Sequence, residues 1–119
     1  MERESISVFL PFYNEEELIE KFTLECHEFL EKLDRDFELL LIDNGSTDNT
    51  GLLANKLEDK KEEIRAIHHE KNKGYGNALR SGFKEAKYPL IFYTDGDAQF
   101  DISDLEKFLN HSEYSAVLG

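Results

Sequence analysis

The sequence predicts an α/β domain with an open, mostly parallel sheet and helices on both of its faces. Strand-like apolar runs alternate with stretches of helical periodicity along the 119 residues, and polar clusters follow the strand-like runs. Neither a repeat nor a low-complexity linker interrupts this alternation. Such an order is typical of parallel strands joined by right-handed helical crossovers. Because the length suits one domain, we expect residues 1–119 to fold as a single unit.

An alternating pattern at residues 5–10 predicts the first strand, which is expected to stop at Pro11 because proline has no N–H for the ladder. Apolar residues then recur at helical spacing, so we expect a long helix over about residues 15–33. Asn14 is the expected N-cap of this helix, and the acidic run after it suits the helix dipole. The single cysteine, Cys26, cannot form an internal disulfide and is expected in the core.

The second strand is expected at residues 37–42, a run too apolar to be half-exposed. Eight polar or glycine residues, 43–50, follow it, and either Thr47 or Asp48 is the expected cap of the next helix. The inner face of that helix is expected to consist of Leu52, Leu53 and Leu57.

A third strand is expected at about residues 64–68, and a helix with one apolar side follows the loop at 70–77. His68 and His69 are adjacent at the end of this strand, so they should point to opposite faces, where they cannot easily share a metal ion. We therefore expect both to be structural. Pro89 should begin a fourth strand, after which a short helix capped by Asp101 or Ser103 and a fifth strand at residues 114–118 are expected.

The charge balance narrows the function classes. The chain carries 26 acidic and 14 basic side chains, a formal net charge of −12. This argues against tracking of nucleic-acid phosphates and against adsorption of the domain by charge to an anionic membrane. The charged start leads directly into a strand-like run, and no apolar stretch approaches the roughly 20 residues that span a bilayer. We expect a cytoplasmic location.

The fourth strand is followed by three oxygen-bearing side chains at alternate positions, Asp95, Asp97 and Gln99. Ligands of open α/β sheets bind beyond the carboxyl ends of the strands, and Gly96 allows the backbone to bend between the two carboxylates. Oxygen ligands of this kind suit Mg²⁺ or Mn²⁺. A turn with a helix cap is the alternative interpretation.

The segment Gly74-Tyr75-Gly76 opens the third helix, whose first backbone N–H groups favour anions. Lys71, Lys73 and Arg80 add positive charge nearby. The glycine spacing is neither that of a P-loop nor that of a dinucleotide fingerprint. The alternative is that the glycines are turn residues and the lysines form a solvated surface.

Four blocks occur in order, each at the end of an expected strand: residues 8–15 (VFLPFYNE), 41–50 (LIDNGSTDNT), 72–82 (NKGYGNALRSG) and 93–99 (YTDGDAQ). This set resembles the nucleotide-sugar-binding half of family 2 glycosyltransferases, which have the GT-A fold. Within that family it is most similar to the polyprenyl-phosphate glycosyltransferases, such as dolichol-phosphate mannose synthase. The resemblance covers nearly the whole chain.

The resemblance implies a role for each block. The nucleotide pocket would be lined by Pro11, Tyr13, Glu15, Asp43, Lys73, Gly74 and Asp95. The ring of Tyr13 would lie against the base, and Asp43 would accept hydrogen bonds from the base or the ribose. The metal, Mg²⁺ or Mn²⁺, would be held by Asp95, Asp97 and Gln99. Asn44 stands where the family has a second acidic residue.

The implied activity is inverting, metal-dependent transfer of a hexose from a UDP- or GDP-sugar, with a polyprenyl phosphate as the acceptor. The acceptor-binding half of the family would follow residue 119. We therefore expect the chain to be the N-terminal nucleotide-sugar-binding domain of a longer enzyme, inactive by itself and working at the cytoplasmic face of a membrane. The alternatives are a non-catalytic nucleotide- or metal-binding module and a transferase with a saccharide or protein acceptor. A phospho-receiver domain is less favoured, because it needs an acidic pair where this chain has Pro11-Phe12-Tyr13.

Overall fold

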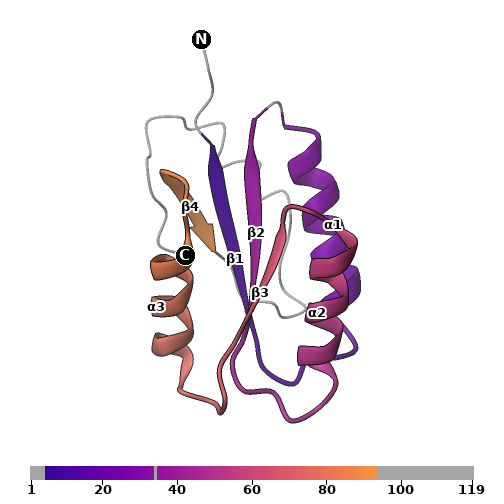
Figure 1. Ribbon diagram of the computed structural model, residues 1–119, viewed down its shortest axis with the longest axis vertical. Helices are drawn as coiled ribbons and strands as arrows, with labels where there is room; N and C mark the ends of the chain where they lie inside the picture. The colour runs from indigo at the N-terminus through magenta and orange to yellow at the C-terminus, as the bar shows by residue number, and fades with distance from the viewer. Residues whose placement is uncertain (1–4, 34, 94–119) are drawn as a thin grey trace.

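The computed structural model describes residues 5–33 and 35–93, which form a parallel sheet between two layers of helices (Figure 1). The strands are β1 (Ile6–Phe12), β2 (Phe37–Asp43), β3 (Ile64–His68) and β4 (Leu90–Tyr93). They pair in parallel in the order β3-β2-β1-β4. The predicted fold class is confirmed. The helix and strand expected after residue 100 lie outside the described residues.

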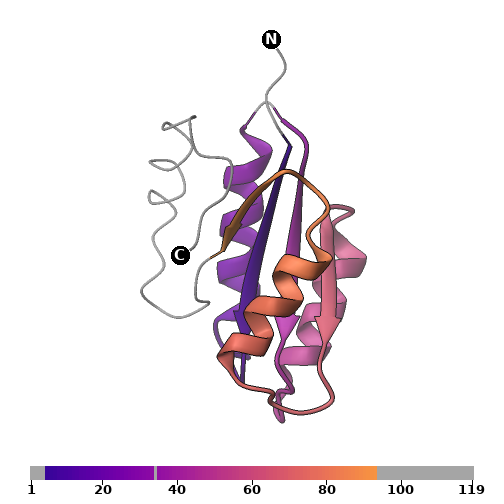
Figure 2. The ribbon, with the colours of Figure 1, turned by 90° about the vertical axis from the view of Figure 1, so that its left-hand side faces the viewer.

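Helices cover both faces of the sheet, as predicted. The helices α1 (Ile19–Glu31) and α2 (Thr50–Lys60) lie on one face, and α3 (Tyr75–Glu85) lies on the other (Figures 1 and 2). Alternate residues of β1 therefore enter different cores. Val8 and Leu10 pack with α1, whereas Phe9 packs with α3 and stacks on Tyr93 at a ring-centroid distance of 5.1 Å. Every residue of β1 is buried, which makes it the centre of the domain.

The first strand continues through Pro11 to Phe12, so the prediction that it stops at the proline is wrong. The carbonyl of Phe12 accepts a hydrogen bond from the N–H of Asn44, the residue after β2. Because successive peptide groups alternate in direction, the nitrogen of Pro11 faces the opposite side, towards β4. In the part of the chain that the structure describes, β4 pairs with β1 only as far as Phe9. Within these residues, the missing proline donor therefore removes no hydrogen bond from the β1–β4 ladder.

Two predicted helix starts are also wrong. The first helix begins at Ile19 rather than near residue 15, and its N-cap position, Leu18, makes no side-chain cap bond. Asn14 has a φ of 51° and directs its side chain to the β2–α2 loop instead. The second helix has Asn49 at the N-cap position, again without a side-chain cap bond. The side chain of Asn14 bonds across loops, whereas Asp48 Oδ1 accepts from the N–H of Thr50, the first residue of α2, at 2.9 Å.

The predicted core positions Cys26, Leu53 and Leu57 are confirmed, and the prediction for Leu52 is wrong. Cys26 is fully buried in α1, and burial raises the pKa of its thiol to about 12. Leu57 is buried and Leu53 packs against the core, but Leu52 is 55% exposed. The helix α2 is rotated so that Ala54 faces the sheet in its place. Among the described helices, none combines the length and apolar character needed to cross a bilayer.

At the amino ends of the strands, a buried carboxylate joins both sheet and helix. Glu38 is 1% exposed and accepts hydrogen bonds from Ser7 Oγ at 2.6 Å, Arg65 at 2.9 Å and the N–H of Lys87 at 2.8 Å. Arg65 also pairs with Glu85 at 3.1 Å. We call these residues the Glu38 network, and it lies at the end of the sheet opposite to the polar loops described next.

Candidate functional site

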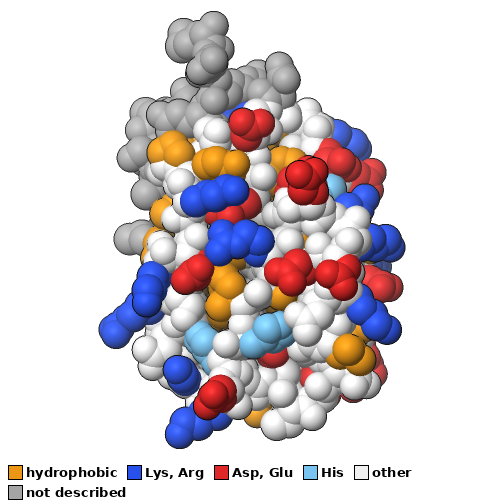
Figure 3. Space-filling model, viewed as in Figure 1, with side chains coloured by type: hydrophobic (Ala, Val, Ile, Leu, Met, Phe, Trp, Pro, Cys, Tyr) orange, Lys and Arg blue, Asp and Glu red, His pale blue; other side chains and the backbone are white. Residues whose placement is uncertain are grey.

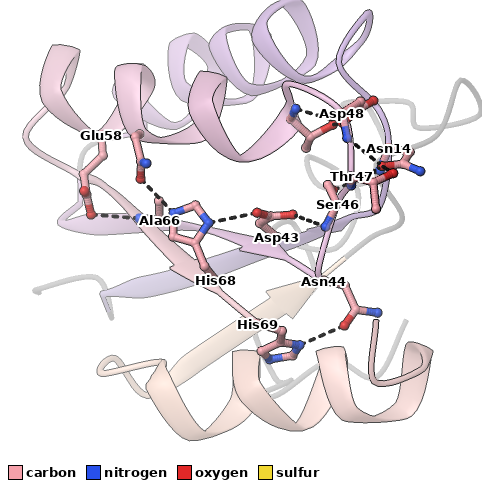
Figure 4. Close-up of polar contacts among 12 residues, drawn as sticks. Asn14, Asp43, Asn44, Ser46, Thr47, Asp48, Glu58, Ala66, His68 and His69 are labelled. Atoms are coloured by element: carbon pink, nitrogen blue, oxygen red, sulfur yellow. Dashed lines mark hydrogen bonds and ion pairs between the residues drawn. The ribbon is translucent and has the colours of Figure 1, made fainter. Parts of the chain in front are cut away.

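The loops that follow β1, β2 and β3 meet at the carboxyl edge of the sheet, which lies at the bottom of Figure 1. Figure 4 shows the polar side chains that join them. The polar clusters that follow these three strands therefore gather at one edge, since parallel strands all end there. We call the hydrogen bonds among these three loops the carboxyl-edge network.

Asn14 joins the first loop to the second. Its Oδ1 accepts hydrogen bonds from the N–H groups of Thr47 at 2.8 Å and Asp48 at 3.3 Å, and its own N–H donates to Ser46 Oγ at 3.0 Å. The N–H of the next residue, Glu15, donates to the hydroxyl of Thr50, the first residue of α2, at 2.8 Å. The loop that carries Tyr13 and Glu15 is therefore held against the loop after β2.

Asp43 lies at the end of β2 with its carboxylate engaged on both oxygens. Oδ1 accepts from the N–H of Ser46 at 3.0 Å, and Oδ2 lies 2.9 Å from His68 Nδ1. A Cβ at Gly51 would stand 2.6 Å from Oδ2, so the first turn of α2 can approach the carboxylate only because residue 51 is glycine. The side chain is 8% exposed. Its oxygens each retain a lone pair for a further donor.

Asn44, one residue later, joins β2 to the loop before α3. Its side-chain nitrogen lies 3.2 Å from Asn72 Oδ1 and 3.3 Å from the carbonyl oxygen of Gly74. Its side-chain oxygen accepts from the N–H of Lys73 at 3.2 Å. The residue is 5% exposed. The second and third loops are thus tied together by one buried carboxamide.

The two histidines point to opposite faces of β3, as predicted (Figure 4). His68 turns to Asp43 and to Asn55 Oδ1 on α2, at 2.7 Å. His69 turns to Asn44 Oδ1 at 2.8 Å and to Ser81 Oγ on α3 at 2.7 Å. Burial and the positive charge of Lys73 lower the pKa of His69, while Asp43 acts in the opposite direction. The neutral form of His69 is therefore favoured.

The start of α3 faces open space at this edge. Gly74 occupies the N-cap position with a φ of 87° and no side-chain cap bond. Apart from its chain neighbours, no heavy atom of the residues that the structure describes lies within 4 Å of where its Cβ would be. Lys73 is exposed beside it, and the first N–H groups of a helix have no partner within the helix. The N–H of Gly74 itself donates to Asn72 Oδ1 at 2.7 Å, so the arrangement offers an anion the positive end of the helix dipole and the charge of Lys73.

The predicted nucleotide-site residues that the structure describes all belong to the carboxyl edge. Pro11 is buried in β1, Glu15 is half-buried, and Tyr13 is 42% exposed. The other three are Asp43 at the end of β2 and the exposed pair Lys73 and Gly74. The sequence reasoning missed the bridging roles of Asn14 and Asn44. Their position directly after strands was the available signal, but nothing local indicates which loop they contact.

The predicted metal ligands Asp95, Asp97 and Gln99, and with them the nucleotide contact of Asp95, lie outside the described residues. Within residues 5–33 and 35–93, no group of three or more histidine, cysteine or acidic side chains is placed to hold a metal ion. Acidic and basic side chains are interspersed on the face shown in Figure 3. On that face the net negative charge does not gather into a single acidic patch.

Comparison with known proteins identifies a family model described as glycosyl transferase family 2, which matches residues 7–118. The undecaprenyl-phosphate 4-deoxy-4-formamido-L-arabinose transferase of Enterobacter sp. (strain 638) is 36% identical over 99 residues, covering 79% of this chain and 29% of that protein. Among solved structures, S. aureus TarS 1–349 in complex with UDP is 26% identical with a TM-score of 0.67, covering 92% of this chain and 33% of that chain.

A second solved structure is similar to the chain at 29% identity and a TM-score of 0.61. It is the glucosyl-3-phosphoglycerate synthase of Mycobacterium tuberculosis in complex with Mn²⁺, UDP and glucosyl-3-phosphoglycerate, and the match covers 79% of this chain and 34% of that one. The chain therefore spans about a third of the length of each of these three matches.

Proposed function

Because the chain belongs to glycosyl transferase family 2, we propose that it is the donor-binding part of a metal-dependent enzyme that transfers a hexose, with inversion, from a UDP- or GDP-sugar. One observation carries this proposal: three loops are tied together at the carboxyl edge, beside a helix start that faces open space. In open α/β sheets this is where ligands bind. Residues 1–119 would be the N-terminal nucleotide-sugar-binding domain of the longer enzyme.

The nucleoside would lie against the loop after β1 and the end of β2. Tyr13 is exposed enough for its ring to stack on a base, while Pro11 and Glu15 would shape the pocket beside it. Asp43 would accept a hydrogen bond from a base N–H or a ribose hydroxyl through the remaining lone pairs of its carboxylate. The contacts of Asp43 with Ser46 and His68 would hold the carboxylate in place for that bond.

The diphosphate would lie at the start of α3, beside Lys73 and Gly74. A cation held by Asp95, Asp97 and Gln99 would stabilise the negative charge that develops on the diphosphate as the glycosidic bond breaks. The chemistry of these side chains fits Mg²⁺ or Mn²⁺, since all three offer oxygen ligands. They follow Tyr93, the last residue of β4, which pairs with the central strand β1. The M. tuberculosis synthase complex, which contains Mn²⁺ and UDP, supports the proposal.

The acceptor would be a polyprenyl phosphate, reached at the cytoplasmic face of a membrane. The name of the Enterobacter relative, an undecaprenyl-phosphate transferase, supports this choice. A saccharide or protein acceptor is the alternative within the family. Because the chain spans only 29% of that relative, a nucleotide- or metal-binding part without activity of its own is a second candidate.

Titration calorimetry with UDP and GDP tests the donor-binding proposal. We expect the 119-residue chain to bind at least one of them, and more tightly with Mn²⁺ or Mg²⁺ than with a chelator. Binding of neither nucleotide under any of these conditions would refute the proposal.

A radiolabelled-donor assay with polyprenyl phosphate tests whether the chain is active alone. Holding an acceptor in line can lower a barrier by about 7–11 kcal/mol, and we place no acceptor-positioning residue in this chain. We therefore expect negligible transfer by residues 1–119. Robust transfer would mean that an acceptor site lies within these residues.

A further inference from the structure

Asn44 uses its whole hydrogen-bonding capacity to join the end of β2 to the loop between β3 and α3. Its two N–H groups face the carbonyl oxygen of Gly74 and Oδ1 of Asn72. Its oxygen faces the N–H of Lys73 and Nδ1 of His69. A carboxamide has two donors and two lone pairs, so the β3–α3 loop occupies all four.

The direction of this carboxamide is fixed by two partners that cannot exchange roles. The carbonyl of Gly74 can only accept a hydrogen bond, and the backbone N–H of Lys73 can only donate one. The nitrogen of Asn44 must therefore face Gly74 and its oxygen must face Lys73. A carboxylate at position 44 would keep the contact with Lys73 but would replace the contact with Gly74 by repulsion between two oxygens.

The backbone around this carboxamide is closely packed, which limits how the loop can move. Gly45 has a φ of 76°, and a Cβ there would lie 2.1 Å from the carbonyl carbon of Lys71. The carbonyl of Gly74 also accepts from the N–H of Ala78 at 3.2 Å, within the first turn of α3. Asn44 therefore holds the peptide at which α3 begins.

We propose that Asn44 is a positioning residue for the diphosphate, whose amide holds Lys73 and Gly74 in the conformation that receives this anion. The inference rests on the proposed function and adds that residue 44 must be a neutral amide rather than the acidic residue of the family pattern. The N–H groups of Lys73 and Gly74 are engaged by Asn44 and Asn72, so the groups that would attract the anion are the ammonium of Lys73 and the positive end of the α3 dipole, which these bonds hold in place.

The substitution Asn44→Asp tests this inference, because a protonated carboxylic acid can again donate one hydrogen bond. At about pH 8, where the acid is ionised, we expect the affinity for UDP or GDP with Mn²⁺ to fall about 10- to 100-fold, as expected for two lost hydrogen bonds. The deficit relative to the unsubstituted chain should shrink as the pH falls and the acid is protonated, since burial at this position raises the pKa of a carboxyl group above its ordinary value of about 3.9. A merely structural role would instead lower the melting temperature in parallel with the affinity at each pH.

Three charged or titratable groups face position 44, and the titration must account for them. His69 and Lys73 approach from the β3–α3 loop, and Asp43 precedes it on β2. Because these groups are present in both proteins, the readout is the ratio of the two affinities at each pH. The substitution Asn49→Asp is the matched control, since it makes the same change at the exposed N-cap position of α2, where the side chain makes no cap bond. We expect it to leave nucleotide affinity unchanged within about twofold.

A second variant covers the case in which Asn44→Asp fails to fold. Asn72 is exposed, and Asn72→Ala removes an acceptor of the Asn44 amide without placing a charge in the interior. It should weaken nucleotide binding several-fold and leave the melting temperature almost unchanged. Affinities equal to that of the unsubstituted chain in the folded variants would overturn the inference and leave the proposed function intact. If the unsubstituted chain binds neither nucleotide, the proposed function fails and the inference fails with it.

Discussion

The two ends of the sheet both carry polar networks, but the networks differ in chemistry. The Glu38 network places a fully buried carboxylate between a hydroxyl, a guanidinium and a backbone N–H, all contributed by strands or by the segment before β4. The carboxyl-edge network joins loops, largely through the neutral amides of Asn14 and Asn44. The first network surrounds a charge with partners, whereas the second leaves a helix start open to solvent.

This difference separates a role in stability from a role in binding. Removing the partner of a buried charge leaves that charge unpaired in an interior that solvates it poorly. Because Glu38 needs its partners for this reason, the Glu38 network holds the strands that carry them in place. Loops linked by neutral amides can hold donors ready for an anion without adding negative charge beside it.

A pocket of about 410 Å³ also lies at the amino end of the sheet. Acidic and basic side chains both line this pocket, so it has no evident preference for an anion.

The largest effect on stability is expected at the amino end. Arg65→Ala leaves Glu38 buried without its cationic partner, and we expect a loss of about 3 kcal/mol of unfolding free energy. Urea unfolding measures this loss, and nucleotide affinity should not change. The control Lys32→Ala removes an exposed pair with Glu28 at 3.6 Å and should have little effect. Equal stability of the two variants would show that the Glu38 network does not stabilise the sheet.

Asp43→Ala should affect both properties, because the residue belongs to the carboxyl edge but is buried at a strand end. We expect nucleotide affinity to fall by about 1–3 kcal/mol, the usual range for a lost hydrogen bond to a charged group. The melting temperature should also fall, since Ser46 and His68 lose their shared partner. Calorimetry and thermal melting together test this. A lower melting temperature with unchanged affinity would make Asp43 purely structural.

Asp97→Asn tests whether the metal that strengthens nucleotide binding is held by the proposed ligands. The substitution should remove most of the gain in UDP or GDP affinity that Mn²⁺ gives over a chelator, because an amide is a weaker ligand than a carboxylate for a hard cation. Asp36→Asn, in the pocket at the amino end, is the matched control and should keep that gain. Calorimetry with and without metal measures both. An undiminished gain in Asp97→Asn contradicts the proposed metal site.

The smallest effect concerns the pKa of His69, which burial and Lys73 lower from the ordinary value of 6.5. A group with a lowered folded-state pKa binds protons less readily than in the unfolded chain. Its contribution to stability is therefore complete above the unfolded pKa and declines as the pH falls below it. An NMR titration of the His69 ring should give a pKa below 6.5, and Lys73→Gln should raise it. A value at or above 6.5 in the unsubstituted chain contradicts this description of the site.

The sequence by itself determined the layers of this domain and the edge at which its polar residues meet. Hydrophobic periodicity is local, so the parallel strands, the helices and the buried Cys26 could be predicted from short stretches of chain. The order of strands and helices then required the loops after β1, β2 and β3 to end at one edge. The four motif blocks at the strand ends added the family, which residues 7–118 confirm.

The tertiary structure decided which polar group each loop contacts. Asn14 was expected to cap its own helix, but its side chain bonds to residues 33 and 34 positions later, and α1 begins at Ile19. The carboxamide of Asn44 reaches residues 28 to 30 positions later. Leu52 matched the helical pattern but faces solvent, because packing against β3 set the rotation of α2. Local propensity cannot specify such contacts, because their partners become neighbours only when the sheet has formed.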